Sequence, residues 1–276
     1  MSHVCVVTGC NERHGFGWLI AEELHRRGST VVATMRDVAA RNRDPAAELG
    51  GVADVRELDV TDDAEATAFV DAVLRDHGRI DAIVNNAAVV RHGPAEQVAP
   101  DTLLQVLDAN VVGPHRLIRA ALPHLRERGS GVIVQVSSIN GFSVAPLSAS
   151  YCASKFALEA YSEVLAYEVG RFGIRVVIVE PSGFSTGVHV RAVWEPGTEV
   201  GPYGPLKQAY WDADLEEWTA EMEDPRIVAR AVADAVEDAD TPLHVPVGGP
   251  AVRRRARYRP VSDDALRRDA LEGVDW

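Results

Sequence analysis

The chain contains almost no lysine. Only Lys155 and Lys207 are lysines among its 28 basic residues, against 41 acidic residues, and the formal net charge is −13. Because affinity for nucleic acid depends on clustered positive charge, this composition argues against a nucleic-acid-binding protein. The one basic run, residues 253–259, is short, and we expect it to be solvated or to face another subunit.

Cysteine is also scarce. Cys5, Cys10 and Cys152 are too few for a disulfide framework, and the spacing of Cys5, Cys10 and His14 does not fit a zinc site. We therefore expect reduced thiols and no bound metal. At 276 residues the chain is long enough to bury a full core without disulfides.

Long apolar runs are missing, so no membrane span is expected, and no signal peptide precedes the first apolar segment at residues 4–9. The expected location is therefore cytoplasmic. The sequence shows no internal repeat and no interdomain linker. We expect one domain over residues 1–250, followed by a polar C-terminal extension over residues 251–276.

Short β-branched runs alternate with amphipathic stretches along most of the chain. Continuously apolar strands separated by helices indicate an α/β fold with a parallel sheet covered on both faces, and right-handed crossovers make that sheet doubly wound. After the second strand we expect a polar loop through Pro45. The expected strands are 4–8, 30–35, 52–58, 80–84, 132–136, 174–179 and 243–247, and the expected helices are 19–27, 61–77, 101–128, 151–171 and 225–237.

A glycine-rich turn follows the first strand. Glycines at such a turn let the backbone approach a pyrophosphate at the positive helix N-terminus, although strand-to-helix turns also need glycine for steric reasons alone. The position after the first strand of a parallel sheet favours phosphate binding. The candidate residues in this turn are Gly9, Asn11, Arg13, Gly15, Phe16 and Gly17.

Other candidate cofactor residues stand at the ends of later strands. Asp59 and Val60 end the third strand, and the segment with Asn86, Ala87 and Ala88 follows the fourth. Separately, each is also consistent with an ordinary polar strand end.

The end of the second strand bears on the choice of cofactor. Arg36 stands there, followed by Asp37, and Arg13 lies in the glycine turn. An arginine accommodates the 2′-phosphate of NADP, whereas an acid in that place favours NAD. Two arginines favour NADP(H), with NAD(H) as the alternative.

Tyr151 and Lys155 lie four residues apart, so on a helix they share a face. A free tyrosine has a pKa of about 10, too high for efficient proton transfer near neutrality. A lysine about 4 Å away in a closed pocket supplies roughly the 4 kcal/mol that a fall of about three units requires. The alternative is an ordinary amphipathic helix with a buried tyrosine and a surface lysine.

Taken together, these motifs resemble the short-chain dehydrogenase/reductase family. The Thr8-Gly9-Cys10 start, the Gly15-Phe16-Gly17 turn and the strand end at residues 33–36 are similar to its hydroxysteroid and retinol dehydrogenase branch. The resemblance runs from residue 4 to about residue 247 and implies a single-domain Rossmann fold. The glycine turn is two residues longer than the family usually has. The matching residues are Gly9, Gly15, Gly17, Asp59, Val60, Asn85, Asn86, Ala87, Asn110, Ser138, Tyr151, Lys155, Pro181, Ser182, Gly183 and Thr186.

The resemblance implies a role for each catalytic candidate. Tyr151 is expected to be the general acid in reduction and the base in oxidation. Ser138 is expected to hold the carbonyl oxygen, and Lys155 to bind the nicotinamide ribose and lower the pKa of Tyr151. Asn110 is expected to hold a water that links Lys155 to solvent. Thr186 and the backbone near Val188 are expected to fix the carboxamide, and Pro181 and Gly183 are further implied cofactor contacts.

Residues 184–223 lie where the family has its substrate lid and are rich in aromatic side chains. Aromatics beside a pocket suit a bulky hydrophobic ketone or secondary alcohol of steroid, terpenoid or polyketide type, although they also serve simply to anchor the lid. The resemblance further implies a homodimer or homotetramer formed through the helices with Asn110 and Tyr151. Two alternatives stay open: an epimerase- or lyase-like step with bound cofactor, and a dinucleotide-sensing regulator.

Overall fold

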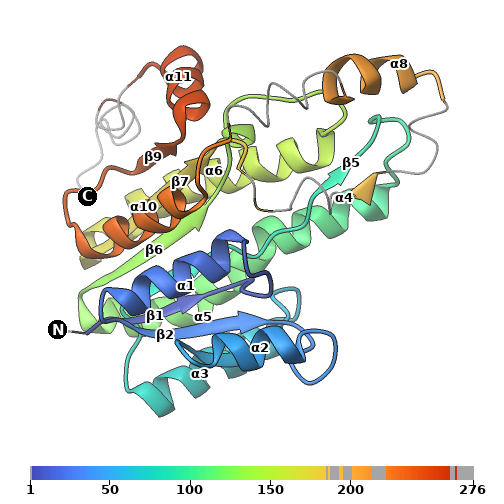
Figure 1. Ribbon diagram of the computed structural model, residues 1–276. Coiled ribbons are helices and arrows are strands. Elements are labelled where there is room, and N and C mark those ends of the chain that lie inside the picture. The colour runs from blue at the N-terminus through green and yellow to red at the C-terminus, as the bar shows by residue number, and fades with distance from the viewer. Residues whose placement is uncertain are drawn as a thin grey trace.

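The computed structural model describes residues 2–184, 186, 193–194, 201–212, 222–261 and 265. At its centre lie seven parallel strands in the order β3-β2-β1-β4-β6-β7-β9 (Figure 1). This is the doubly wound Rossmann sheet that the sequence predicted. The strands are β1 (Val4–Val7), β2 (Thr30–Met35), β3 (Asp54–Glu57), β4 (Ala82–Asn85), β6 (Gly131–Val136), β7 (Ile174–Pro181) and β9 (His244–Val247).

Helices cover both faces of the sheet, which explains why the strands are apolar without alternation. On β1, Cys5 and Val7 join the core under α1 (Phe16–Arg26) and α10 (Arg226–Glu237). Val4 and Val6 point the other way, into the core under α3 (Asp63–His77) and α5 (Gly113–Arg128). The longest helix, α6 (Ala149–Val169), packs on β6 and β7 beside α5. The three cysteines are free and buried, as expected.

The polar loop expected after the second strand is partly helical. It contains the start of α2 (Arg43–Leu49), which buries Leu49. A larger difference concerns the single helix expected over residues 101–128. It is divided into α4 (Pro100–Leu107), a π-helical turn η1 (Asp108–Val112) and α5. Pro114 has no N–H and cannot donate to the carbonyl of Asn110 four residues earlier. The helix widens there, and Gly113 donates to the carbonyl of Asp108, five residues back.

The C-terminal part of the described chain packs on the same domain as the central sheet. Helix α11 (Gly249–Tyr258) starts before the expected boundary at residue 250 and packs against β9. The expectation that the basic run 253–259 is solvated is wrong for Arg255, which is buried and bonded to Glu180. Residues 262–264 and 266–276 of the expected extension lie outside the described residues.

The expected lid over residues 184–223 is described only in part. Its strand β8 (Val193–Trp194) pairs with β5 (Arg91–His92), and helix α8 (Gly204–Lys207) continues into the π-turn η4 (Gln208–Asp212). In Figure 1, β5 and α8 lie together beyond the carboxyl ends of the central strands. Across the described ranges, none of the helices has both the length and the apolar character needed to cross a membrane.

Candidate active site

A cleft of about 1640 Å³ lies along the carboxyl ends of the central strands. All the cofactor residues expected from the sequence line this cleft except Val188, which lies outside the described residues. Of the four catalytic candidates, Ser138, Tyr151 and Lys155 line it. Ligands of doubly wound sheets bind at this edge, so the fold brings residues from separate strands to one place.

The glycine turn is fastened to the turn after β4. Asn86 donates from its side chain to the carbonyl oxygens of Thr8 (2.8 Å) and Gly9 (3.2 Å), and the Thr8 hydroxyl accepts from the backbone N–H groups of Asn86 and Ala87. Gly9 has a φ of +74°, which favours glycine. A Cβ on Gly17 would lie 2.4 Å from the Gly9 carbonyl oxygen. The close approach needed for a pyrophosphate cradle is therefore present, and the turn fits a dinucleotide.

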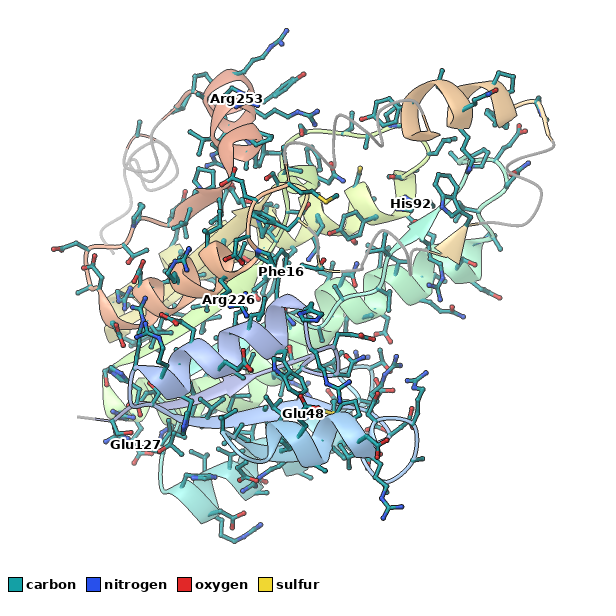
Figure 2. All side chains as sticks on the ribbon, viewed as in Figure 1. Phe16, Glu48, His92, Glu127, Arg226 and Arg253 are labelled. Carbon is teal, nitrogen blue, oxygen red and sulfur yellow. The ribbon has the colours of Figure 1, made fainter. Side chains whose placement is uncertain are left out.

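Arginines gather at the part of the cleft beside the glycine turn and the end of β2. It is called the adenosine end below, because the resemblance places that half of the cofactor there. Arg13 lies in the glycine turn, in which Gly15 donates to the carbonyl of Glu12, and it pairs with Glu48 on α2 (labelled in Figure 2). The Arg36 guanidinium lies 3.5 Å from the Asp59 carboxylate. Asp37, the residue that would favour NAD, has a φ of 52° and pairs with Arg41 at 3.0 Å. Arg13, Arg36 and Arg41 line the cleft, whereas Asp37 is not among the lining residues.

The side chain of Asp59 is fixed by hydrogen bonds from Thr61, two residues later in the same loop. Its carboxylate accepts from the backbone N–H (2.9 Å) and the hydroxyl (2.7 Å) of Thr61. Burial works to raise the pKa of Asp59, but the bonds from Thr61 and the charge of Arg36 outweigh it and lower that pKa. An ionised, fixed carboxylate at this position suits contact with an adenine amino group.

Tyr151 stands in the first turn of α6, beside Ser138 at the end of β6. Ser138 caps the short helix η2 (Ile139–Gly141), accepting from the Asn140 N–H at 3.1 Å. Burial raises the pKa of Tyr151 to about 12, and a hydrogen bond with Ser138 opposes that rise. The phenol is therefore protonated at neutral pH and in contact with a second hydroxyl.

Lys155 lies one helical turn after Tyr151 and is 3% exposed. Its ammonium donates to the carbonyl of Val136 at 2.8 Å and lies 5.8 Å from the centre of the Tyr151 ring. Burial lowers the pKa of Lys155 to about 8, while the charge of Glu159 acts in the opposite direction. The sequence alternative of a surface lysine is therefore wrong.

Asn110 does not line the cleft. Its side chain donates to the Val89 carbonyl (2.9 Å) and the Ser154 hydroxyl (3.0 Å) and accepts from the Val89 N–H (2.8 Å). It therefore ties the segment after β4 to α6 directly behind Tyr151. Its own carbonyl is the one that Pro114 leaves without the usual helical donor.

The segment after β7, where the resemblance places the nicotinamide, forms a further part of the cleft; this part is called the nicotinamide end below. Pro181, Gly183 and Thr186 line it, and Thr186 is 5% exposed. The Phe184 ring packs edge-on against Phe16 at 5.6 Å, which joins this segment to the glycine turn. Figure 2 shows Phe16 at the start of α1.

Sequence reasoning did not find a buried ionic cluster behind α6. Glu180 on β7 accepts from His244 (2.8 Å) and from Arg255 (2.6 Å), and His244 lies 3.4 Å from the carboxylates of both Glu159 and Glu163. Burial works to lower the pKa of His244, but the three carboxylates raise it to about 11. Glu159 and Glu163 follow Lys155 at four-residue spacing on α6, which was the available signal.

The fold and cleft define a dinucleotide-dependent oxidoreductase with a tyrosine, a serine and a lysine at its centre. Residues 3–195 match the family model described as "short chain dehydrogenase". The chain belongs to the short-chain dehydrogenase/reductase family, and its cofactor is a nicotinamide dinucleotide.

Relatives agree with that assignment. The chain is 30% identical to retinol dehydrogenase 8 of Bos taurus, over 93% of this chain and 82% of that protein. It is similar in structure to a short-chain dehydrogenase from Streptomyces avermitilis, with 33% identity, full coverage of both chains and a TM-score of 0.80. It is also similar to a metagenomic short-chain oxidoreductase in complex with NADP, with 28% identity, coverage of 90% and 97%, and a TM-score of 0.69.

Proposed function

We propose that this protein is an NADP(H)-dependent oxidoreductase that interconverts a bulky hydrophobic ketone and its secondary alcohol. The observation that carries the proposal is that Tyr151, Ser138 and Lys155 come together from β6 and α6 at the lining of one cleft. The cofactor supplies or accepts the hydride. The chain positions the reactants and moves the proton.

Each of these three side chains has a distinct task. The Tyr151 hydroxyl gives its proton to the substrate oxygen in reduction and takes it back in oxidation. The Ser138 hydroxyl, already bonded to Tyr151, holds the substrate oxygen where negative charge develops. Lys155, fixed by the Val136 carbonyl, presents a positive charge to the nicotinamide ribose and to the phenol. Asn110 keeps the backbone behind them in place and offers its carbonyl to a water that relays protons.

The preference for NADP(H) rests on the adenosine end of the cleft. Three arginines line it, whereas Asp37 is turned toward Arg41. The pairs made by Arg13 and Arg36 join side chains that are between a third and just over a half exposed. Such partly solvated pairs are weak, so the phosphate of a cofactor can replace the carboxylate. A 2′-phosphate accepts both charge and forked hydrogen bonds from arginine.

The substrate proposal rests on the other end of the cleft. Val90, Ile139, Ala145 and Met222 line it beside Tyr151. Apolar walls with a few polar groups suit a large hydrophobic molecule. Similarity to a retinol dehydrogenase agrees with that size and polarity.

The decisive experiment measures absorbance at 340 nm with NADPH and a panel of bulky ketones. We expect net oxidation of NADPH by the wild-type protein, and loss of turnover with retained NADPH binding in Tyr151→Phe. Conversion of a substrate without net redox change would favour an epimerase or lyase. NADPH binding with no turnover of any panel member would favour a regulator.

A further inference from the structure

Two arginines at the substrate end of the cleft have no carboxylate partner in the described part of the chain. Among the described residues, the Arg91 guanidinium on β5 donates to the adjacent Val90 carbonyl, at 3.2 Å. Arg254 on α11 is half-buried and makes a 3.5 Å contact with the Ser143 hydroxyl. Both line the cleft.

Other arginines of the same cleft are paired. Arg13, Arg36 and Arg41 at the adenosine end, and Arg226 at the start of α10, each lie within 4 Å of an acidic side chain. Acidic residues outnumber basic ones by 41 to 28, so carboxylates are abundant. A half-buried guanidinium that has no carboxylate partner still carries N–H donors, and these are available to a ligand in the cleft that it lines.

The fold holds Arg254 in place through its neighbour. Arg255 points inward and donates to the buried Glu180, which anchors α11 to β7. Successive helical residues point about 100° apart, so the anchored helix turns Arg254 toward η2, where Ser143 bonds to the Ile139 carbonyl. Ile139 follows Ser138 directly. Figure 2 labels Arg253 on the same helix.

Arg91 approaches the reaction centre from the other side. The hydroxyl of Ser150 donates to the Arg91 carbonyl at 3.3 Å, and Ser150 immediately precedes Tyr151. His92, the next residue, stacks on Trp194 of β8 at 5.0 Å. Arg91 therefore stands between the N-terminus of α6 and the lid strand. Arginine side chains thus reach the substrate end of the cleft both from α11 and from β5.

We infer that the substrate is an oxo acid or hydroxy acid: an apolar body with the reacting carbon at one end and a carboxylate that Arg254 binds. Arg91 adds positive charge to the same part of the cleft. This inference rests on the proposed function and narrows its substrate class. Arginine forks match carboxylate geometry, and the apolar residues that line the same cleft accommodate the body of the molecule.

The test compares keto acids with their methyl esters. The probes are 4-oxo-4-phenylbutanoate, 5-oxo-5-phenylpentanoate and 6-oxo-6-phenylhexanoate, each against its ester, with NADPH as reductant. We expect kcat/KM for the best acid to exceed that of its ester by roughly 10- to 100-fold. In Arg254→Met this preference disappears, mainly through KM for the acid, while KM for NADPH is unchanged.

The matched control is Arg257→Met. Arg257 lies on the same helix, is exposed and does not line the cleft, so this variant keeps the acid preference. Acids and esters reduced equally well by the wild type would overturn the inference, as would a rise in KM for NADPH in Arg254→Met.

Calorimetry separates this inference from the proposed function. If no probe is reduced, the failure lies with the oxidoreductase proposal. The carboxylate site is then still tested by calorimetry, which measures the affinity of the NADP complex for 4-phenylbutanoate and for the uncharged 4-phenylbutanamide. Tighter binding of the acid in wild type but not in Arg254→Met supports the inference, and equal binding of acid and amide refutes it.

Discussion

The ammonium of Lys155 donates to the carbonyl of Val136 at 2.8 Å, in a site where the lysine is only 3% exposed. Burial lowers its pKa to about 8, so the positive charge is lost as the pH rises through that value. Because kcat/KM for NADPH reports the free enzyme, we expect it to fall above about pH 8. Initial rates between about pH 6 and pH 10 check this.

Two variants test whether Lys155 causes that fall. Glu159→Gln removes the charge that opposes the lowered pKa, so the fall moves to lower pH. Lys155→Arg keeps a permanent charge, so whatever activity it retains shows no fall in this range. An identical profile in all three proteins would exclude Lys155 as the titrating group.

The cluster at the adenosine end makes a prediction about cofactor choice. Arg36→Ala removes a guanidinium that lines the cleft 3.5 Å from Asp59. We expect kcat/KM with NADPH to fall roughly 10- to 100-fold, as for loss of a charge-assisted hydrogen bond, with little change for NADH. Arg75 pairs with Asp76 outside the cleft, so Arg75→Ala is the control. A larger loss with NADH than with NADPH would contradict the proposed preference.

The sheet could be predicted because its strands are continuously apolar and separated by amphipathic stretches. The π-turn at Asn110 was missed, although Pro114 was a visible sign, because periodicity over 101–128 continues through it. The cluster around His244 could not be predicted, since β7, β9 and α11 meet α6 only through tertiary packing. Local spacing placed Tyr151 and Lys155 on one face, but Arg254, which lines the same cleft, comes from 99 residues beyond Lys155 in the chain, and spacing does not reveal that proximity.

Packing of the glycine turn gives a test of the dinucleotide cradle. In Gly17→Ala the new Cβ would lie 2.4 Å from the Gly9 carbonyl oxygen and 2.6 Å from the Asn86 side chain. We expect a loss of about 1–3 kcal/mol or more in unfolding free energy together with weakened NADPH binding. Urea denaturation and fluorescence titration measure these. At Gly170, where nothing lies within 4 Å, alanine should be neutral or stabilise slightly. Equal behaviour of the two variants would refute the close approach.

The cluster behind α6 predicts a pH-dependent stability difference. His244→Gln leaves Glu159, Glu163 and Glu180 with less positive charge, and removing one partner of a buried ion pair costs about 3–5 kcal/mol. Since the pKa of His244 is raised to about 11 in the folded state from about 6.5 unfolded, its stabilisation is full below about pH 6.5 and declines as the pH rises toward 11. Burial raises the pKa of Glu180, the nearest partner, to about 7, so the comparison is made above that value. Urea unfolding at about pH 8 should show a larger difference between wild type and variant than at about pH 10. His25→Gln, on the exposed side of α1, is the control. A difference that grows with pH would contradict the assignment.

Exposed apolar side chains on α4, η1 and α6 give a test of the homo-oligomer that the family resemblance implies. Leu104 on α4 is 61% exposed, Val112 on η1 is 39% exposed and Val164 on α6 is 53% exposed, and these elements pack against one another. Val164→Glu places a charge in the contact and should convert a dimer or tetramer to monomers, measured by light scattering at micromolar concentration. Val261→Glu, also exposed but far along the chain in the segment after α11, should leave the oligomer intact. Wild-type protein that is monomeric at that concentration would rule out the assembly, and loss of the oligomer in both variants would place the contact elsewhere.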